Sequence, residues 1–201
     1  MNAQTQRLSW PGPAGALDVA IDEPTGPLQG VAVLCHPHPL HGGTLDNKVV
    51  QTLARAAVQL GHRAVRFNFR GVGGSQGAWD AGQGEVEDAL AVIAAARQPG
   101  LPLLLGGFSF GGYVASQAAA RTEDVAKVTL VGPAVVNFNV APLPAGSLVV
   151  HGEADDVVPL AACFDWARPL AQPVTVVPGA GHFFHGQLPL LKQLLVAAWS
   201  V

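Results

Sequence analysis

The stretch LPLLLGGFSFGGYVASQ, residues 101–117, decides how the rest of the chain is interpreted. It begins with an apolar run typical of a strand that is buried on both faces, and it continues into a helical pattern. Between the two, four glycines lie within residues 106–112, with Ser109 at their centre. Glycine weakens the interior of a strand or helix, so this density needs a local reason. A sharp turn from a buried strand into a helix, with Ser109 at its tip, provides one.

Length and composition indicate one globular unit. The chain has 201 residues, of which 49% are apolar and 12% are charged, and we expect a single domain over residues 1–201. The formal net charge of −3 and the lack of any block of Lys and Arg argue against nucleic acid or an anionic membrane as a partner. The first fifteen residues lack the apolar core of a signal peptide, which predicts a cytoplasmic protein.

One uncharged segment, residues 98–120, is close to the length of a membrane span. It contains five glycines and changes period partway, so it predicts a strand, a turn and a buried helix instead. Cys35 ends an apolar run and is predicted to be a buried thiol rather than half of a disulfide.

Short apolar runs alternate with helical stretches along most of the chain. The predicted parallel strands are VAVLC, RAVRFNF, LPLLLGG, KVTLVG, SLVVHG and VTVVPG. The predicted helices are DNKVVQTLARAAVQLG, GEVEDALAVIAAARQ, GGYVASQAAARTE, VPLAACFDWARPLA and QLPLLKQLLVAAWSV. Ahead of them, QRLSW and GALDVAID form an expected antiparallel pair joined by the turn PGPAG. The pattern predicts an α/β fold: a mostly parallel, doubly wound sheet of about eight strands with helices on both faces.

The turn around Ser109 carries a chemical motif. GFSFG, residues 107–111, matches the G-x-S-x-G nucleophile elbow, in which a strained turn presents the serine and the glycines avoid collisions on either side. The start of the following helix directs backbone N–H groups toward developing negative charge. Taken alone, the motif is equally compatible with a tight strand–helix turn that has a capping serine.

A candidate acid follows a later strand, in HGEADDVVP. Asp155 lies in the loop that leaves this strand, and the carboxyl ends of parallel strands are where ligand sites collect in α/β proteins. Its neighbour Asp156 competes for the role, because one residue of register separates them. We favour Asp155 and expect Asp156 to be a capping or solvent-exposed residue.

A candidate base follows the last strand, in VTVVPGAGHFFHG. His182 lies in a loop flanked by glycines, whereas His185 is expected within the following helix. The order Ser109, Asp155, His182 along the chain is that of an α/β-hydrolase triad.

A tetrahedral oxyanion needs two hydrogen-bond donors, and the sequence suggests both. One is the N–H of Phe110, the residue after the serine. The other is expected from the loop in VAVLCHPHPLHGGT, where Pro37 and Pro39 have no N–H and leave the backbone of His38 as the best-placed donor. The HGG at His41–Gly43 is an alternative.

The same loop allows a metal hypothesis. His36, His38 and His41 form an H-x-H-x-x-H pattern, and histidine is a common metal ligand. In metallo-hydrolases with this pattern an aspartate normally precedes the third histidine, whereas Leu40 stands there in this chain. We therefore predict no metal and no other cofactor.

These motifs together identify a resemblance. Over nearly its whole length the chain resembles the α/β-hydrolase superfamily, and it is most similar to small lidless bacterial serine hydrolases related to dienelactone hydrolases and acyl-protein thioesterases. The stretches that carry this are CHPHPLHGGTLDNKVV, FNFRGVGGSQG, GFSFGG and HGEADDVVP. Relatives of dienelactone hydrolase often have a cysteine nucleophile where this chain has Ser109, which argues against dienelactone as the substrate.

The resemblance implies a function. In such enzymes the serine attacks an ester or thioester carbonyl, the histidine is the general base and the acid orients it. The connection GPAVVNFNVAPLPAG leaves no room for a helical lid, so we expect an open site for small or exposed acyl groups, lined by Phe183 with Trp79 at its edge. The partner is then a small-molecule acyl ester or thioester. Two alternatives remain: a non-catalytic hydrolase-fold binding protein, and a metal-dependent hydrolase that uses the three loop histidines.

Overall fold

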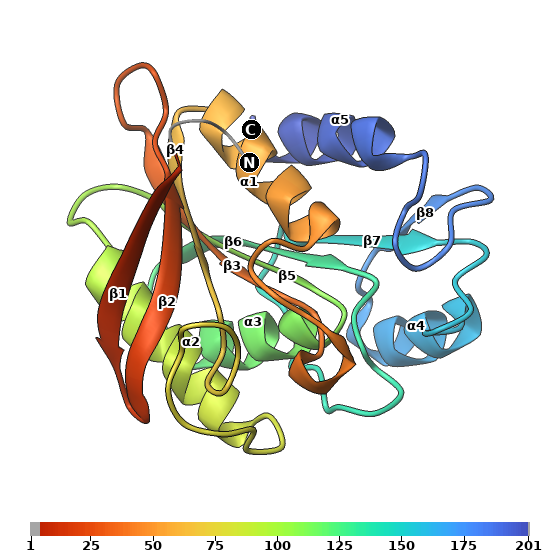
Figure 1. The fold of residues 1–201 in the computed structure, drawn as a ribbon. Coiled ribbons are helices and arrows are strands. Elements are labelled where there is room, and N and C mark those ends of the chain that lie inside the picture. The colour runs from red at the N-terminus through yellow and green to blue at the C-terminus, as the bar shows by residue number, and fades with distance from the viewer. Residues whose placement is uncertain (1–4, 201) are drawn as a thin grey trace.

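The computed structural model describes residues 5–200, which contain an eight-stranded sheet in the order β1-β2-β4-β3-β5-β6-β7-β8 (Figure 1). The strands are β1 (Gln6–Gly12), β2 (Gly15–Asp22), β3 (Gly30–Cys35), β4 (His62–Phe67), β5 (Leu103–Phe108), β6 (Val125–Val131), β7 (Leu148–Gly152) and β8 (Thr175–Val177). The first two pair antiparallel with each other, and β2 pairs antiparallel with β4. All pairs from β4 through β8 are parallel, as the sequence predicted.

Helices cover both faces of the sheet. They are α1 (Lys48–Gln59), α2 (Gln83–Ala96), α3 (Phe110–Ala120), α4 (Leu160–Ala167) and α5 (Leu188–Trp199), with short 3₁₀ turns at Pro39–His41 and Arg168–Leu170. Helices α1 and α5 lie together on one face, and α2, α3 and α4 lie on the other (Figure 1). This is the doubly wound arrangement expected from alternating strands and helices.

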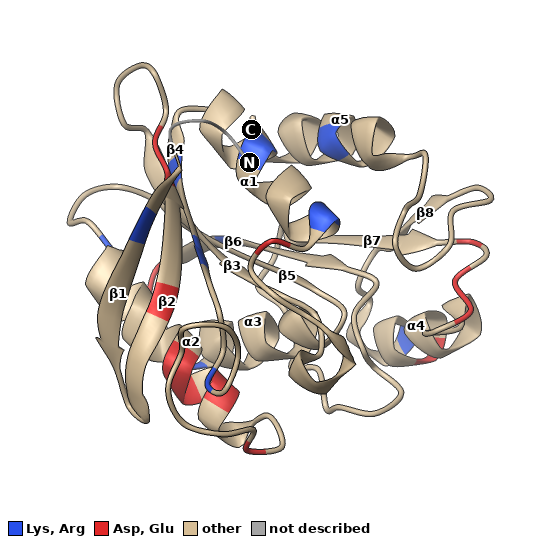
Figure 2. Ribbon diagram, in the orientation of Figure 1, with Lys and Arg blue, Asp and Glu red and all other residues tan. Residues whose placement is uncertain are grey.

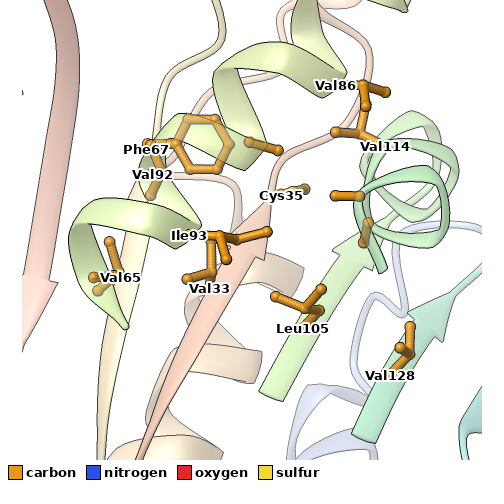
Figure 3. Packing of buried hydrophobic residues seen from close by; sticks show 14 of the residues in the cluster. Val33, Cys35, Val65, Phe67, Val86, Val92, Ile93, Leu105, Val114 and Val128 are labelled. Atoms are coloured by element: carbon orange, nitrogen blue, oxygen red, sulfur yellow. The ribbon is translucent and has the colours of Figure 1, made fainter. Parts of the chain in front are cut away.

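The two faces bury separate apolar clusters, and the alternation of side chains along a strand explains how. On β3, Val33 and Cys35 point to the cluster that contains α2 and α3, whereas Leu34 points to the cluster that contains α1 and α5. Figure 3 shows the first cluster, with Val33 and Leu105 of the sheet beneath residues of the helices. The central strands β3 and β5 carry no charged residue (Figure 2), because both of their faces are covered.

The connection between β6 and β7 confirms the prediction that no lid is present. Residues 132–147 form no helix, and they are fastened to the helices beneath them. The indole N–H of Trp166 donates to the carbonyl of Val140 (3.0 Å), and the side-chain amide of Gln117 donates to the carbonyl of Asn139 (2.6 Å). The ends of the parallel strands therefore stay uncovered on this side.

The uncharged segment at residues 98–120 forms β5, a turn and α3, as expected. Within residues 5–200, no helix combines the length and the apolar character that crossing a membrane would take. Cys35 is a buried free thiol, and so is Cys163 on α4.

Candidate active site

Ser109 lies at the tip of the turn between β5 and α3 with a backbone φ of 56° and ψ of −119°. A positive φ is strained for any residue except glycine. Both flanking glycines are required by close approach: a Cβ on Gly107 would lie 2.0 Å from the carbonyl oxygen of Gly111, and a Cβ on Gly111 would lie 2.2 Å from that of Cys35. The two flanking glycines therefore make the strained turn at Ser109 possible.

Backbone hydrogen bonds hold Ser109 in this conformation. Its N–H donates to the carbonyl of Val131 on β6 (2.9 Å). Its own carbonyl accepts from the N–H groups of Gly112 (2.9 Å) and Ala134 (3.2 Å). Because contacts from three directions determine the backbone, the strain persists in the folded state.

The structure brings the three predicted residues into one hydrogen-bonded line. His182 Nε2 lies 3.0 Å from Ser109 Oγ, and His182 Nδ1 lies 2.7 Å from Asp155 Oδ2. Because an ionised carboxylate only accepts hydrogen bonds, Nδ1 carries the proton and Nε2 is free to accept from the serine hydroxyl. All three residues are buried.

Asp155 is held as a carboxylate by donors on both oxygens. Its Oδ1 accepts from the backbone N–H groups of Val157 (3.0 Å) and Val158 (2.8 Å), while Oδ2 faces His182. Burial raises the pKa of Asp155, but the hydrogen bonds from His182 and Val158 outweigh it and leave the pKa below its ordinary value. Asp156 is exposed, so the structure places the favoured candidate, and not its neighbour, against the histidine.

The loop that carries His182 differs from the prediction at one position. His185 was expected within the next helix, but it is exposed in a turn, and α5 begins only at Leu188. The backbone gives the reason, because Phe184 has a φ of 52° and Gly186 a φ of 75°, both outside the helical region. The buried ring of Phe184 anchors this turn to the α1/α5 cluster.

Neither of the two predicted oxyanion donors has a hydrogen-bond acceptor within the described residues. In the part of the chain that the structure describes, neither the N–H of His38 nor that of Phe110 donates a hydrogen bond. The alternative donors in the same loop are used: His41 and Gly43 both donate to the carbonyl of His38 (3.1 and 3.0 Å), and Gly42 donates to that of Pro39 (3.3 Å). The geometry favours His38 over the His41–Gly43 alternative.

The buried side chain of His36 connects this loop to the segment after β4 through hydrogen bonds to the backbone. Its Nδ1 lies 2.7 Å from the carbonyl oxygen of Pro37, and its Nε2 accepts from the N–H of Phe69 (3.1 Å). Both ring nitrogens are therefore committed to the backbone, which leaves none for a metal ion in the pattern His36, His38, His41. Within residues 5–200, no group of three His, Cys, Asp or Glu side chains is arranged to hold a metal.

The buried His36 predicts a pH-dependent stability. Burial lowers its pKa to about 4 despite the hydrogen bond to Pro37. As pH falls below 6.5, His36 is therefore protonated in the unfolded chain but stays neutral in the folded protein. The contribution of neutral His36 to the free energy of unfolding is complete above pH 6.5 and is lost as pH falls toward 4. Between pH 7 and pH 5 we expect the wild type to lose about 2 kcal/mol more of its free energy of unfolding than His36→Gln does. Urea unfolding at the two pH values measures this. Equal losses in the two proteins would contradict the account.

A small pocket of about 140 Å³ opens beside the serine hydroxyl. Its lining consists of Pro37, His38, His41, Gly42, Gly43, Asn47, Ser109, Val157, His182 and Phe183. Phe183 therefore lies where the sequence placed it, with its ring 5.1 Å from that of His182. Trp79 is not part of this lining. Its ring packs against the rings of His38 (4.6 Å) and Phe110 (5.2 Å).

Comparisons with known proteins agree with the fold described above. The sequence profile of the family described as serine aminopeptidase, S33, matches residues 29–146, more than half of the chain. The chain belongs to this family of α/β-hydrolases. XC6422 from Xanthomonas campestris, an α/β serine hydrolase without a lid, has a TM-score of 0.89 and 39% identity, covering 98% of this chain and 94% of that one.

Two further relatives of this α/β-hydrolase extend the comparison. An α/β serine hydrolase homologue from Coxiella burnetii has a TM-score of 0.88 and 42% identity, covering 96% of each chain. "Uncharacterized protein RP471" of Rickettsia prowazekii (strain Madrid E) is 33% identical over 194 residues, 89% of this chain and 82% of that protein. The predicted superfamily and the lidless fold are confirmed, and the protein is a hydrolase.

Two residues that line the pocket of this hydrolase were not expected there from its sequence. Val157 is exposed and lies two residues after the acid, and Asn47 caps the first turn of α1, where its Oδ1 accepts from the N–H of Val49 (2.9 Å). The sequence signal that could have predicted Val157 is the VVP after the acid, because it places an apolar side chain in the loop beside the candidate acid.

Proposed function

We propose that the protein hydrolyses carboxylic esters or thioesters of small or exposed acyl groups through an acyl-enzyme on Ser109. One observation supports this above all: the hydrogen-bonded line from Ser109 through His182 to Asp155, with distances of 3.0 and 2.7 Å. This is the geometry that turns a serine hydroxyl into a nucleophile.

The proposed reaction has two steps. His182 Nε2 takes the hydroxyl proton while Ser109 Oγ bonds to the carbonyl carbon, and the same nitrogen then gives the proton to the leaving alcohol or thiol as its bond breaks. In the second step a water molecule replaces the alcohol and releases the acid by the same proton transfers. Asp155 fixes the Nδ1–H tautomer of the imidazole and stabilises the imidazolium.

The oxyanion of each tetrahedral intermediate would be bound by the N–H groups of His38 and Phe110. Both are without an acceptor in the described chain, and Phe110 is the first residue of α3, whose dipole favours negative charge at this end. Each such donor is typically worth about 10²–10³ in kcat.

The pocket lining favours a neutral acyl substrate over a peptide with a free amino terminus. An aminopeptidase has to bind an α-ammonium group, and a carboxylate is the usual partner of such a charge. None of the residues that line the pocket is acidic, and the nearby Asp155 has both oxygens engaged with His182, Val157 and Val158. We therefore propose ester or thioester cleavage although the family is described by an aminopeptidase.

A chain-length series tests the proposal. Within a series of p-nitrophenyl esters of increasing acyl length, we expect kcat/KM to be higher for the acetate and the butyrate than for longer chains. The reason is that a pocket of about 140 Å³ holds only a few carbon atoms. Leucine p-nitroanilide should not be hydrolysed. Faster cleavage of the anilide than of the esters would overturn the proposed substrate class.

The wall of the pocket predicts a change in KM. Phe183→Ala removes an apolar contact of the acyl group, and we expect KM for the butyrate ester to rise about fivefold, an effect of about 1 kcal/mol, with little change in kcat. Phe164→Ala is the matched control, since Phe164 is also exposed but lies on α4 outside the lining. Equal changes in both variants would show that Phe183 does not contact the substrate.

A further inference from the structure

His151 is a second histidine beside the acid, and its protonation state follows from its partners. It lies on β7, fully buried, with Nε2 2.8 Å from the carbonyl oxygen of Val158. A carbonyl only accepts hydrogen bonds, so Nε2 carries the proton and Nδ1 does not. In the described part of the chain, Nδ1 has no hydrogen-bond partner.

An unpartnered nitrogen in the core is unfavourable, and an apolar side chain at this position would avoid it. The presence of a histidine at this position is therefore explained by the contacts of its Nε2–H. That N–H donates to the carbonyl of Val158, and the N–H of Val158 donates to Asp155 Oδ1 (2.8 Å). The same Nε2 lies 3.4 Å from Asp155 Oδ2, the oxygen that accepts from His182.

We propose that His151 is a positioning residue that fixes the orientation and charge of Asp155. This inference rests on the proposed function of the triad and extends it by one residue. His151 braces the carbonyl side of Val158, and Val158 in turn holds the carboxylate. Its N–H also places a positive dipole beside the oxygen that faces His182. The titratable groups around this cluster are Asp155, His182 and, from α4, Cys163.

Removing the N–H has two consequences. The carboxylate loses part of its support, so His182 spends less time aligned with the serine. The negative charge on Asp155 Oδ2 is also less compensated, so the imidazole keeps its extra proton to a higher pH. The first effect lowers kcat, and the second moves the acid limb of the pH profile upward.

The test compares three variants on p-nitrophenyl butyrate. His151→Leu removes the donor, whereas His151→Gln keeps an N–H at a similar reach. His62→Leu is the matched control, because His62 is also buried with an unpartnered Nδ1 but lies at the amino end of β4, whereas Ser109 follows the carboxyl end of the parallel strand β5. For His151→Leu we expect kcat to fall about 10- to 100-fold with little change in KM. We also expect its acid limb to move up by about half a pH unit.

His151→Gln should recover most of the lost kcat and the original acid limb, and His62→Leu should leave both unchanged. An unmoved acid limb in His151→Leu, or an equal loss in His151→Gln, would overturn the proposal. If the leucine variant does not fold, His151→Phe repeats the test with a planar ring that lacks the N–H.

A second readout does not depend on turnover. The proton between His182 Nδ1 and Asp155 Oδ2, whose heavy atoms lie 2.7 Å apart, should give a downfield resonance in the proton NMR spectrum of the folded protein. We expect this resonance to shift or broaden in His151→Leu and to persist unchanged in His62→Leu. An unchanged resonance in both variants would refute the role of His151. A shifted resonance in a protein that cleaves no ester would refute only the proposed function.

Discussion

Ser109→Ala should lower kcat/KM for p-nitrophenyl butyrate by about 10⁴-fold or more, because within residues 5–200 no other hydroxyl is placed against His182 Nε2. The melting temperature should change little, since alanine keeps the strain of a φ of 56° at this position. Activity assays and thermal unfolding on the same preparation measure both quantities.

The control for this variant is Ser116→Ala. Ser116 is a buried serine of α3, the helix that follows Ser109, and its hydroxyl donates to the carbonyl of Tyr113 (2.7 Å) and accepts from the N–H of Ala141 (3.0 Å). Its loss should affect stability and leave turnover near the wild-type rate. Residues that act as one unit are not additive, so His182→Ala combined with Ser109→Ala should be no worse than Ser109→Ala alone. Ester turnover near the wild-type rate in Ser109→Ala would contradict the assignment.

Gly111→Ala should disrupt both the fold around the elbow and the activity. By helix propensity alone, alanine within α3 would stabilise the protein by about 1 kcal/mol. Its Cβ, however, would lie 2.2 Å from the carbonyl oxygen of Cys35 and 2.5 Å from that of His36, both of them backbone atoms. Relieving this collision has to move α3 away from the loop that carries His38, and so separate the two proposed oxyanion donors.

We therefore expect Gly111→Ala to destabilise the protein by about 2 kcal/mol or more and to lower kcat by about 10²–10³. Gly112→Ala is the matched control, because its Cβ would meet Pro133 at 3.3 Å, a distance that a slight shift relieves. Urea unfolding and ester kinetics on the two variants give the comparison. If Gly111→Ala were as stable and as active as Gly112→Ala, the elbow would not depend on this close approach.

The sequence predicted the fold and the meeting of three side chains because each signal was local. Buried strands read as apolar runs, and the ends of parallel strands gather at one edge of the sheet, so a serine, an acid and a histidine after three different strands were expected to meet. The distances confirm that Ser109, Asp155 and His182 do so. In the sequence, only the register of the motif distinguished Asp155 from Asp156. In the structure, the N–H groups of Val157 and Val158 donate to Asp155 Oδ1 and hold this carboxylate against His182.

What the sequence did not predict depends on loop conformations and on contacts between distant segments. The position of His185 followed from a positive φ at Phe184, which is rare for a residue that is not glycine and leaves no compositional signal. The packing of Trp79 against the ring of His38 could not be foreseen, because side-chain directions in an irregular segment follow no period. The contact between His151 and Asp155 depends on how the acid loop folds back over β7.

Covalent labelling shows whether the Ser109 hydroxyl is activated by His182. A fluorophosphonate probe, followed by mass spectrometry of the intact protein and its peptides, should give one adduct per chain, located on Ser109. The adduct should be absent in Ser109→Ala and should form far more slowly in His182→Ala. An unlabelled Ser109 in folded wild-type protein, or an adduct elsewhere, would contradict the account and favour a hydrolase fold that binds without catalysing.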